Sequence, residues 1–90
     1  EGIAVAAELL ADYAGKYEFR NLVLTVTSEE DHLYAQMTGQ GKYEIYGRSE
    51  TEFFWKVAVA SVEFVRDESG EVSQAVIHQG PAVIPAVRVK

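Results

Sequence analysis

The sequence contains no cysteine, which removes several kinds of chemistry at once. Disulfide bonds, thiolate zinc sites and cysteine nucleophiles are all excluded. No apolar run comes near the ~18 residues of a membrane-spanning helix. No stretch shows the charged, apolar and small-residue regions of a signal peptide. These absences leave a domain without thiol chemistry, and they leave its compartment open.

Positive charge is scarce and dispersed. The chain has 8 lysine and arginine residues against 14 acidic residues, for a formal net charge of −6. The basic residues stand singly along the sequence. Nucleic acid and anionic membrane surfaces bind concentrated positive charge. We therefore expect neither of them as a partner.

What is present indicates one folded domain with a short helix at its start. The chain has 90 residues, 48% of them hydrophobic, with 11% aromatic. A chain of this length supports a single core. Ile3, Ala6, Ala7 and Leu10 recur at helical spacing, and Gly15 is expected to stop the helix soon afterwards. We assign residues 1–12 to a helix or linker and residues 13–90 to the main domain.

Almost everything after Gly15 alternates between apolar and polar residues, which is typical of strands. Pro85 is expected at an edge, a bulge or the start of its strand. The turns include a strong hairpin signal at 67–70. The strands are expected at 16–19, 22–28, 32–38, 42–49, 52–57, 60–66, 72–78 and 83–89.

The connections between these segments are too short for crossover helices, so neighbouring strands should pair antiparallel. An all-β, up-and-down barrel of about eight strands follows, and a sandwich of two sheets is the alternative. We expect side chains to fill most of the interior. The residues predicted to face inward are Leu22, Leu24, Val26, Leu33, Ala35, Met37, Tyr43, Ile45, Val62, Phe64 and Ile77.

The aromatic run at 53–55 cannot be buried inside a barrel as a whole. Phe53, Phe54 and Trp55 are consecutive, so at least one ring must point outward. Tyr46 on the preceding strand is expected beside them. Large exposed apolar patches usually mark contacts. Either the N-terminal helix covers these four residues, or they contact a domain or a partner.

Four polar or aromatic residues are candidates for contacting a ligand inside the barrel. Gln36 or Gln74, depending on bulges, together with Gln79, could face inward, and Tyr43 is predicted to do so. Buried polar groups need hydrogen-bond partners. A ligand could supply them, although turns or water do so more commonly.

Two acidic clusters do not predict metal sites. Residues 29–32 read Glu-Glu-Asp-His, but neighbouring side chains on a strand or turn point in different directions. A solvated hairpin tip explains them better. Residues 67–70 vaguely resemble a calcium loop, yet the alternating acids and the distal glutamate are missing. We expect no metal, no cofactor and no catalytic residue in this chain.

Several short motifs occur in a particular order. They are Leu10-x-x-Tyr13-x-Gly15-x-Tyr17, then Leu33-x-Ala35-x-x-x-Gly39-Gln40, then Ser49-Glu50-x-x-Phe53-Phe54, then Val62-x-Phe64-x-x-Asp67-x-x-Gly70-x-Val72, and finally His78-Gln79-Gly80. Together they resemble the lipocalin-like β-barrel domain found C-terminal to serine β-lactamase-like hydrolases of the penicillin-binding and D-aminopeptidase group. The resemblance covers most of the chain.

The resemblance implies an accessory role. The nucleophile of that family lies on a Ser-x-x-Lys motif in the preceding domain, and no serine here has lysine three positions on. No Tyr-x-Asn occurs either, because Asn21 is the sole asparagine. His78-Gln79-Gly80 mimics an active-site element of the family but is better explained as a strand end and a turn.

The implied partners are an upstream catalytic domain or further copies of the chain, and the implied location is periplasmic or extracellular. The rival hypothesis is a free-standing barrel that binds a small apolar ligand, which requires a cavity of a few hundred cubic ångströms. An independent enzyme is disfavoured, because neither His32 nor His78 has an evident nucleophile or carboxylate partner.

Overall fold

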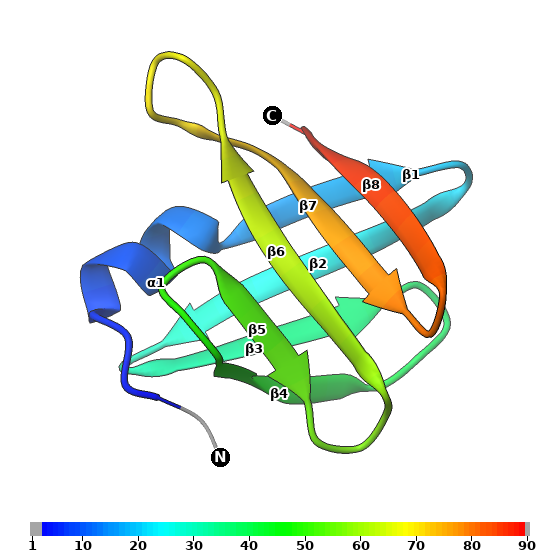
Figure 1. Ribbon diagram of the computed structural model, residues 1–90, viewed down its shortest axis with the longest axis horizontal. Helices are drawn as coiled ribbons and strands as arrows, with labels where there is room; N and C mark the ends of the chain where they lie inside the picture. Colours follow the sequence, from blue (N-terminus) through cyan, green and yellow to red (C-terminus); the bar gives the residue numbers. More distant parts are fainter. Residues whose placement is uncertain (1–2, 90) are drawn as a thin grey trace.

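A computed structural model of the chain describes residues 3–89 as a closed β-barrel with one short helix against one end (Figure 1). The all-β prediction is confirmed. The elements are α1 (Ala7–Tyr13), β1 (Gly15–Phe19), β2 (Leu22–Glu29), β3 (His32–Met37), β4 (Lys42–Gly47), β5 (Glu52–Trp55), β6 (Ala60–Arg66), β7 (Val72–Gln79) and β8 (Ala82–Val89).

Each strand pairs antiparallel with the next, and the last strand closes onto the first. In that closing pair, Lys16 lies opposite Val89 and Tyr17 opposite Arg88. A sandwich would leave two separate sheets, so the closure decides in favour of the barrel. Pro85 lies opposite Val76 of β7, in a part of β8 that does not pair with β1. It therefore occupies an edge position, as its missing N–H requires.

The helix lies further along the chain than its apolar spacing predicts. The spacing predicts a helix from Ile3 to Leu10, but the helix begins at Ala7 and ends at Tyr13. Ile3 instead forms a bridge with Gly47, whose carbonyl accepts a hydrogen bond from the Ile3 amide at 2.8 Å. Among residues 3–89, no helix is long and apolar enough to cross a bilayer.

The shift has a packing cause. Leu10 and Tyr13, three positions apart on one helix face, are 2% and 1% exposed and fill the end of the barrel. Ala14 is already extended, so Gly15 opens β1 and does not cap the helix. The segment assigned to a helix or linker thus shares its core with the strands.

The interior follows the predicted alternation except at one end. Leu22 and Tyr43, both predicted to be inward, are 37% and 43% exposed. Both stand at the start of their strands, β2 and β4, and these strands start at the end of the barrel away from α1 (Figure 1). Met37 is half-buried there. The remaining predicted inward residues are buried, namely Leu24, Val26, Leu33, Ala35, Ile45, Val62, Phe64 and Ile77.

Candidate functional site

The aromatic run of β5 divides between the two faces of the strand. Phe53 points inward and is 2% exposed. Its ring meets those of Tyr13 and Phe64 edge-on, each at a centroid distance of 5.7 Å. Tyr13 in turn stacks on Phe64 at 4.4 Å. Phe53 therefore belongs to the core that joins α1 to β5 and β6, and it does not lie on the outer face.

Two buried tyrosines hold α1 against the barrel. The Tyr13 hydroxyl donates to the carbonyl oxygen of Glu50 at 2.5 Å, and the Tyr17 hydroxyl donates to the carbonyl oxygen of Tyr13 at 2.7 Å. Burial raises the pKa of Tyr17 to about 12, against the opposing charge of Arg88, and burial also raises the pKa of Tyr13. Both hydroxyls stay protonated at neutral pH and act as structural donors.

Phe54 and Tyr46 form the outer half of the aromatic group. Their rings lie 6.0 Å apart and both are half-buried. The Arg48 guanidinium lies 5.2 Å from the Phe54 ring, and the Lys56 ammonium lies 4.1 Å from the Tyr46 ring. Cations at these distances are attracted to the ring faces. These two cationic side chains therefore lie beside the rings of Phe54 and Tyr46. The helix α1 packs elsewhere, at the end of the barrel against β2 and β3.

The four residues predicted to line the barrel interior separate into two pairs. Gln36 lies exposed, where its amide donates to the carbonyl oxygen of Gln40 at 3.1 Å. Gln74 precedes the buried Ala75 in β7, so it lies on the outer face of its strand. Tyr43 and Gln79 line the same hollow, at the open end of the barrel.

These two residues line a hollow of about 300 Å³ that opens at the end opposite α1. Its wall is drawn from five consecutive strands, β3 to β7. Trp55, the third residue of the aromatic run, points into it. The inward-facing residues around it are Ala35, Met37, Tyr43, Trp55, Ala60, Ile77 and Gln79.

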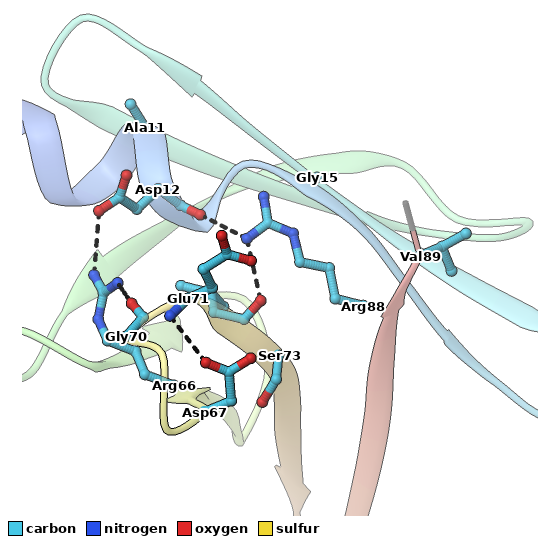
Figure 2. Close-up of a pocket in the computed structure, with 11 residues that line it drawn as sticks. Ala11, Asp12, Gly15, Arg66, Asp67, Gly70, Glu71, Ser73, Arg88 and Val89 are labelled. Atoms are coloured by element: carbon cyan, nitrogen blue, oxygen red, sulfur yellow. Dashed lines mark hydrogen bonds and ion pairs between the residues drawn. The ribbon is translucent and has the colours of Figure 1, made fainter.

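A larger hollow of about 630 Å³ lies at the α1 end, and sequence reasoning missed it (Figure 2). Arg88 reaches across it from β8. Its Nη1 donates to the carbonyl oxygens of Asp12 and Val72 at 3.0 and 3.3 Å, and its Nη2 donates to that of Ala14 at 2.7 Å. Asp12 and Ala14 lie at the end of α1, where carbonyl groups lack helical partners. Arg88 therefore stabilises the helix end.

The second arginine of this hollow also has internal partners. Arg66 donates through Nη1 to the Gly70 carbonyl oxygen at 2.7 Å and through Nη2 to the Asp12 carboxylate at 3.3 Å. Figure 2 shows both arginines directed toward α1, with Arg66 beside the 67–71 turn as well. Hydrogen bonds within the domain thus account for both guanidinium groups.

Gly15 explains how Arg88 fits. A Cβ atom at Gly15 would lie 3.1 Å from Nε and from Nη2 of Arg88, and the backbone φ there is +154°.

The sequence contains one signal for the structural role of Arg88. It is an arginine at an inward position of an otherwise apolar strand, two residues after the buried Ala86. Such a charge has to find partners inside the fold.

The 67–70 segment forms a hairpin turn, as expected. One carboxylate oxygen of Asp67 accepts hydrogen bonds from the Ser69 amide, the Ser69 hydroxyl and the Glu71 amide at 2.9, 2.6 and 3.1 Å. These bonds, that from the Ser69 hydroxyl first, hold the pKa of Asp67 below its usual value. The carboxylate is thereby engaged in closing its own turn.

The acidic segment at 29–32 places its side chains on separate partners. His32 Nδ1 lies 2.6 Å from a Glu44 carboxylate oxygen, and its Nε2 lies 3.2 Å from one of Asp31. Glu29 instead accepts a hydrogen bond from Lys42 at 2.7 Å. Hydrogen bonding to Glu44 raises the pKa of His32. Within residues 3–89, no three acidic or histidine side chains gather closely enough to hold a metal.

The motif His78-Gln79-Gly80 is a strand end followed by a turn. His78 lies on the outer face of β7, opposite Ser61 of β6. Gly80 has a φ of +59°, in the left-handed region that glycine adopts without strain. The Ser73 hydroxyl, further back in β7, donates to the Val65 carbonyl oxygen at 3.3 Å.

Comparison with known proteins gives two matches. Residues 2–87 match the family described as a domain of unknown function, DUF3471. The chain is also 30% identical over 88 residues to "Penicillin-binding protein 4*" of Bacillus subtilis (strain 168). That alignment covers 97% of this chain but only 19% of the relative. The chain thus spans about a fifth of the length of the curated relative it matches.

Proposed function

Because this chain belongs to the DUF3471 family, and because it matches one region of a penicillin-binding protein, we propose that it is a non-catalytic accessory barrel of a β-lactamase-like serine hydrolase. It packs against the catalytic domain of the same polypeptide. The coverage of the alignment carries this proposal. Nearly the whole chain aligns with a fifth of the relative, so the matching region is a small part of that protein.

The chemistry of the residues supports a role without catalysis. The sequence has no Ser-x-x-Lys. A serine nucleophile needs an adjacent base, and Ser73 in the larger hollow donates to a backbone carbonyl oxygen. The hydroxyls of Tyr13 and Tyr17 likewise donate to backbone oxygens and resist deprotonation. These groups stabilise the barrel and leave the reaction to another domain.

The outer face of β8 is the surface that best fits this packing. Val83 and Val87 are 61% and 63% exposed, Val89 is 39% exposed, and Pro85 between them is exposed as well. The inward positions of the strand are apolar too, except for Arg88. An antiparallel strand with one wet face normally alternates with polar residues. A strand with apolar side chains on both faces is typically covered by other protein on both faces.

The size of this face favours a tethered domain over a second copy. A stable complex of separate chains buries roughly 800 Å² on each partner. One strand with four small side chains offers much less. A domain held on the same chain meets the face at high effective concentration, so a small contact suffices. We therefore propose intramolecular packing over homo-oligomerisation.

The test is a chimera in which this chain replaces the matching region of the Bacillus subtilis protein. We expect the chimera to unfold in one cooperative transition in calorimetry, because the barrel and its neighbour stabilise each other. Val83→Lys with Val87→Lys should split that transition in two. The same pair of substitutions in the isolated chain should change its unfolding temperature little, because both side chains are exposed.

A matched control is Thr25→Lys with Thr27→Lys, on the outer face of β2. Both threonines alternate with the buried Leu24 and Val26. This pair should leave the single transition of the chimera intact. Two transitions in the unsubstituted chimera would contradict packing against the neighbour. Hydrolysis of a β-lactam by the isolated chain at an enzyme-like rate would contradict the accessory role altogether.

A further inference from the structure

We propose that the open end of the barrel binds a small neutral molecule that joins a flat apolar ring to a carboxamide or hydroxyl group. The site is the 300 Å³ hollow beside Trp55. This inference goes beyond the accessory role and does not depend on it. It concerns what the isolated barrel can bind at the end that α1 leaves uncovered.

The hollow is a blind cup and not a channel. At the other end, Leu10 and Tyr13 of α1 close the barrel, and between the ends Leu24, Val62 and Phe64 are each at most 2% exposed. Small side chains create the space, since Ala35 and Ala60 occupy inward positions where most others carry larger groups. A molecule that enters would therefore stop against packed side chains at the floor of the hollow.

The walls suit a ring. Trp55 and Tyr43 face the hollow together with Met37 and Ile77. Tyr43 is 43% exposed and Val57 at the rim is 68% exposed, so much apolar surface there is wet. Covering it releases water, which is the main driving force for apolar binding. Aromatic side chains add offset or edge-on contacts with a flat ligand.

The charge of the lining selects a neutral ligand. Charged residues make up 24% of the chain, yet none of the residues that line the hollow is charged. An ion that entered would lose hydration without gaining a counter-charge. A neutral ring meets no such penalty.

Polar groups at the rim of the hollow can fix the orientation of the ligand. The Tyr43 hydroxyl and the amides of Gln40 and Gln79 lie in the lining. Among residues 3–89, no side-chain hydrogen bond engages the Tyr43 hydroxyl or the Gln79 amide. A carboxamide or hydroxyl on the ligand complements them, because a few placed polar groups in an apolar pocket are what orient a ligand.

The probes are benzamide and benzoate, which have nearly the same shape but differ in charge. The cup has room for roughly ten water molecules, enough for a substituted six-membered ring. Nuclear magnetic resonance suits the titration, since Trp55 is the single tryptophan and gives one indole N–H signal. Benzamide should move that signal saturably with a Kd of about 1 mM, and benzoate should bind at least tenfold more weakly.

Variants locate the binding. Ala60→Leu fills the cup and should abolish the saturable shift. Tyr43→Ala removes a wall and a hydroxyl from an exposed position and should weaken binding about fivefold, as for many truncated contact residues. Tyr34→Ala is the control, because Tyr34 alternates with the buried Leu33 and Ala35 on β3 and so lies on the outer face. Binding by this variant should be unchanged.

Four results would overturn the proposal. The first is the absence of a saturable shift up to roughly 20 mM benzamide, which is about twenty times the expected Kd. The second is equal binding of benzoate, and the third is undiminished binding by the variants of the cup. If Ala60→Leu does not fold, Tyr43→Ala against Tyr34→Ala still decides the location. A shift that appears only with a protein fragment and never with benzamide would also overturn it, since the cup would then be a protein contact.

Discussion

Arg88 links the last strand, β8, to the end of α1 by hydrogen bonds. It extends from the last strand to carbonyl oxygens at the end of α1 and at the start of β7. Arg88→Met keeps much of the apolar stem and removes these bonds. We expect it to lower the free energy of unfolding by about 2–4 kcal/mol, because charged hydrogen bonds to partly buried carbonyls are lost together. Urea denaturation measures this loss.

The matched control is Arg48→Met. Arg48 pairs with Glu52 at 3.2 Å on the surface, four residues along the chain. Such exposed pairs contribute only about 0–1 kcal/mol. Equal losses for the two substitutions would show that the carbonyl contacts of Arg88 contribute nothing beyond a surface charge.

Gly15 provides a second test of the same contact. Gly15→Ala places a methyl group 3.1 Å from the Arg88 guanidinium, at a φ of +154°. We expect a loss of about 1–3 kcal/mol, part of it backbone strain and part displacement of Arg88. In an Arg88→Met background the second part should shrink, and a double-mutant cycle by urea denaturation measures that coupling.

Gly39→Ala serves as the comparison for Gly15. Gly39 has a φ of +82°, but an added Cβ would meet nothing within 4 Å. Its cost should come from the backbone alone and should not depend on residue 88. Strict additivity for Gly15→Ala as well would contradict the proposed clash with Arg88.

His32 should make the stability of the barrel depend on pH. The hydrogen bond to Glu44 raises its pKa in the folded state above the ordinary value of 6.5. The protonated form is thus favoured by folding, and its contribution is complete below pH 6.5. It is lost as pH rises through the folded-state pKa. We expect the unfolding temperature to fall across that window, and less so in His32→Gln.

Direct titration checks the assignment. The imidazole resonances of His32 should titrate above pH 6.5 in the folded chain, and Glu44→Gln should move the midpoint downward. Asp31 lies 3.2 Å from the other ring nitrogen but ranks below Glu44 as a cause. An unchanged midpoint in Glu44→Gln would exclude this hydrogen bond as the main cause.

At the scale of elements, α1 closes one end of the barrel with its buried side chains. Leu10 is 2% exposed and packs into the core from the helix. Leu10→Ala should lower the free energy of unfolding by about 2–5 kcal/mol, as for other buried leucines. Glu8→Ala on the exposed side should change it by less than about 0.5 kcal/mol. Denaturant curves that coincide for these two variants would contradict the claim that α1 stabilises the barrel by closing its end.

The position of this helix shows what local patterns can and cannot predict. The small apolar residues from Ile3 onward have helical spacing, which places the helix too early. The structure favours Ala7–Tyr13, because only that register buries both Leu10 and Tyr13 in the end of the barrel. Tyr13 stacks on the ring of Phe64, which lies 51 residues further along the chain, and this contact favours the observed position of the helix. No local window contains that contact.

At the scale of the whole molecule, the wall of the barrel is uneven. The pairing of β6 with β7 runs from Ala60 to Arg66, whereas β5 has four residues and short ladders on both sides. We expect amide hydrogens of β6 and β7 to exchange slowest and those around Trp55 in β5 fastest among the strands, because short ladders open locally. Native-state hydrogen exchange measures the order. Equal protection of β5 and β7 would contradict it.

The overall barrel is predictable from the sequence, and its two ends are not. Alternation and short turns are properties of neighbouring residues, and they suffice to indicate eight antiparallel strands. Which end is closed depends on the helix, so the alternation wrongly places Tyr43 and Leu22 in the filled interior. The role of Arg88 escapes sequence reasoning for the same reason, since its partners belong to α1 and β7. Likewise, the exposed face of β8 follows from register, not from composition.

The bridge between Ile3 and Gly47 has a mechanical consequence. The Ile3 amide binds the Gly47 carbonyl oxygen at 2.8 Å, and a Cβ at Gly47 would lie 2.8 Å from a methyl carbon of Val5. The segment is thus laid tightly along the end of β4 before it enters α1. A pulling force applied ahead of Ile3 would act on this hydrogen bond before it reached α1.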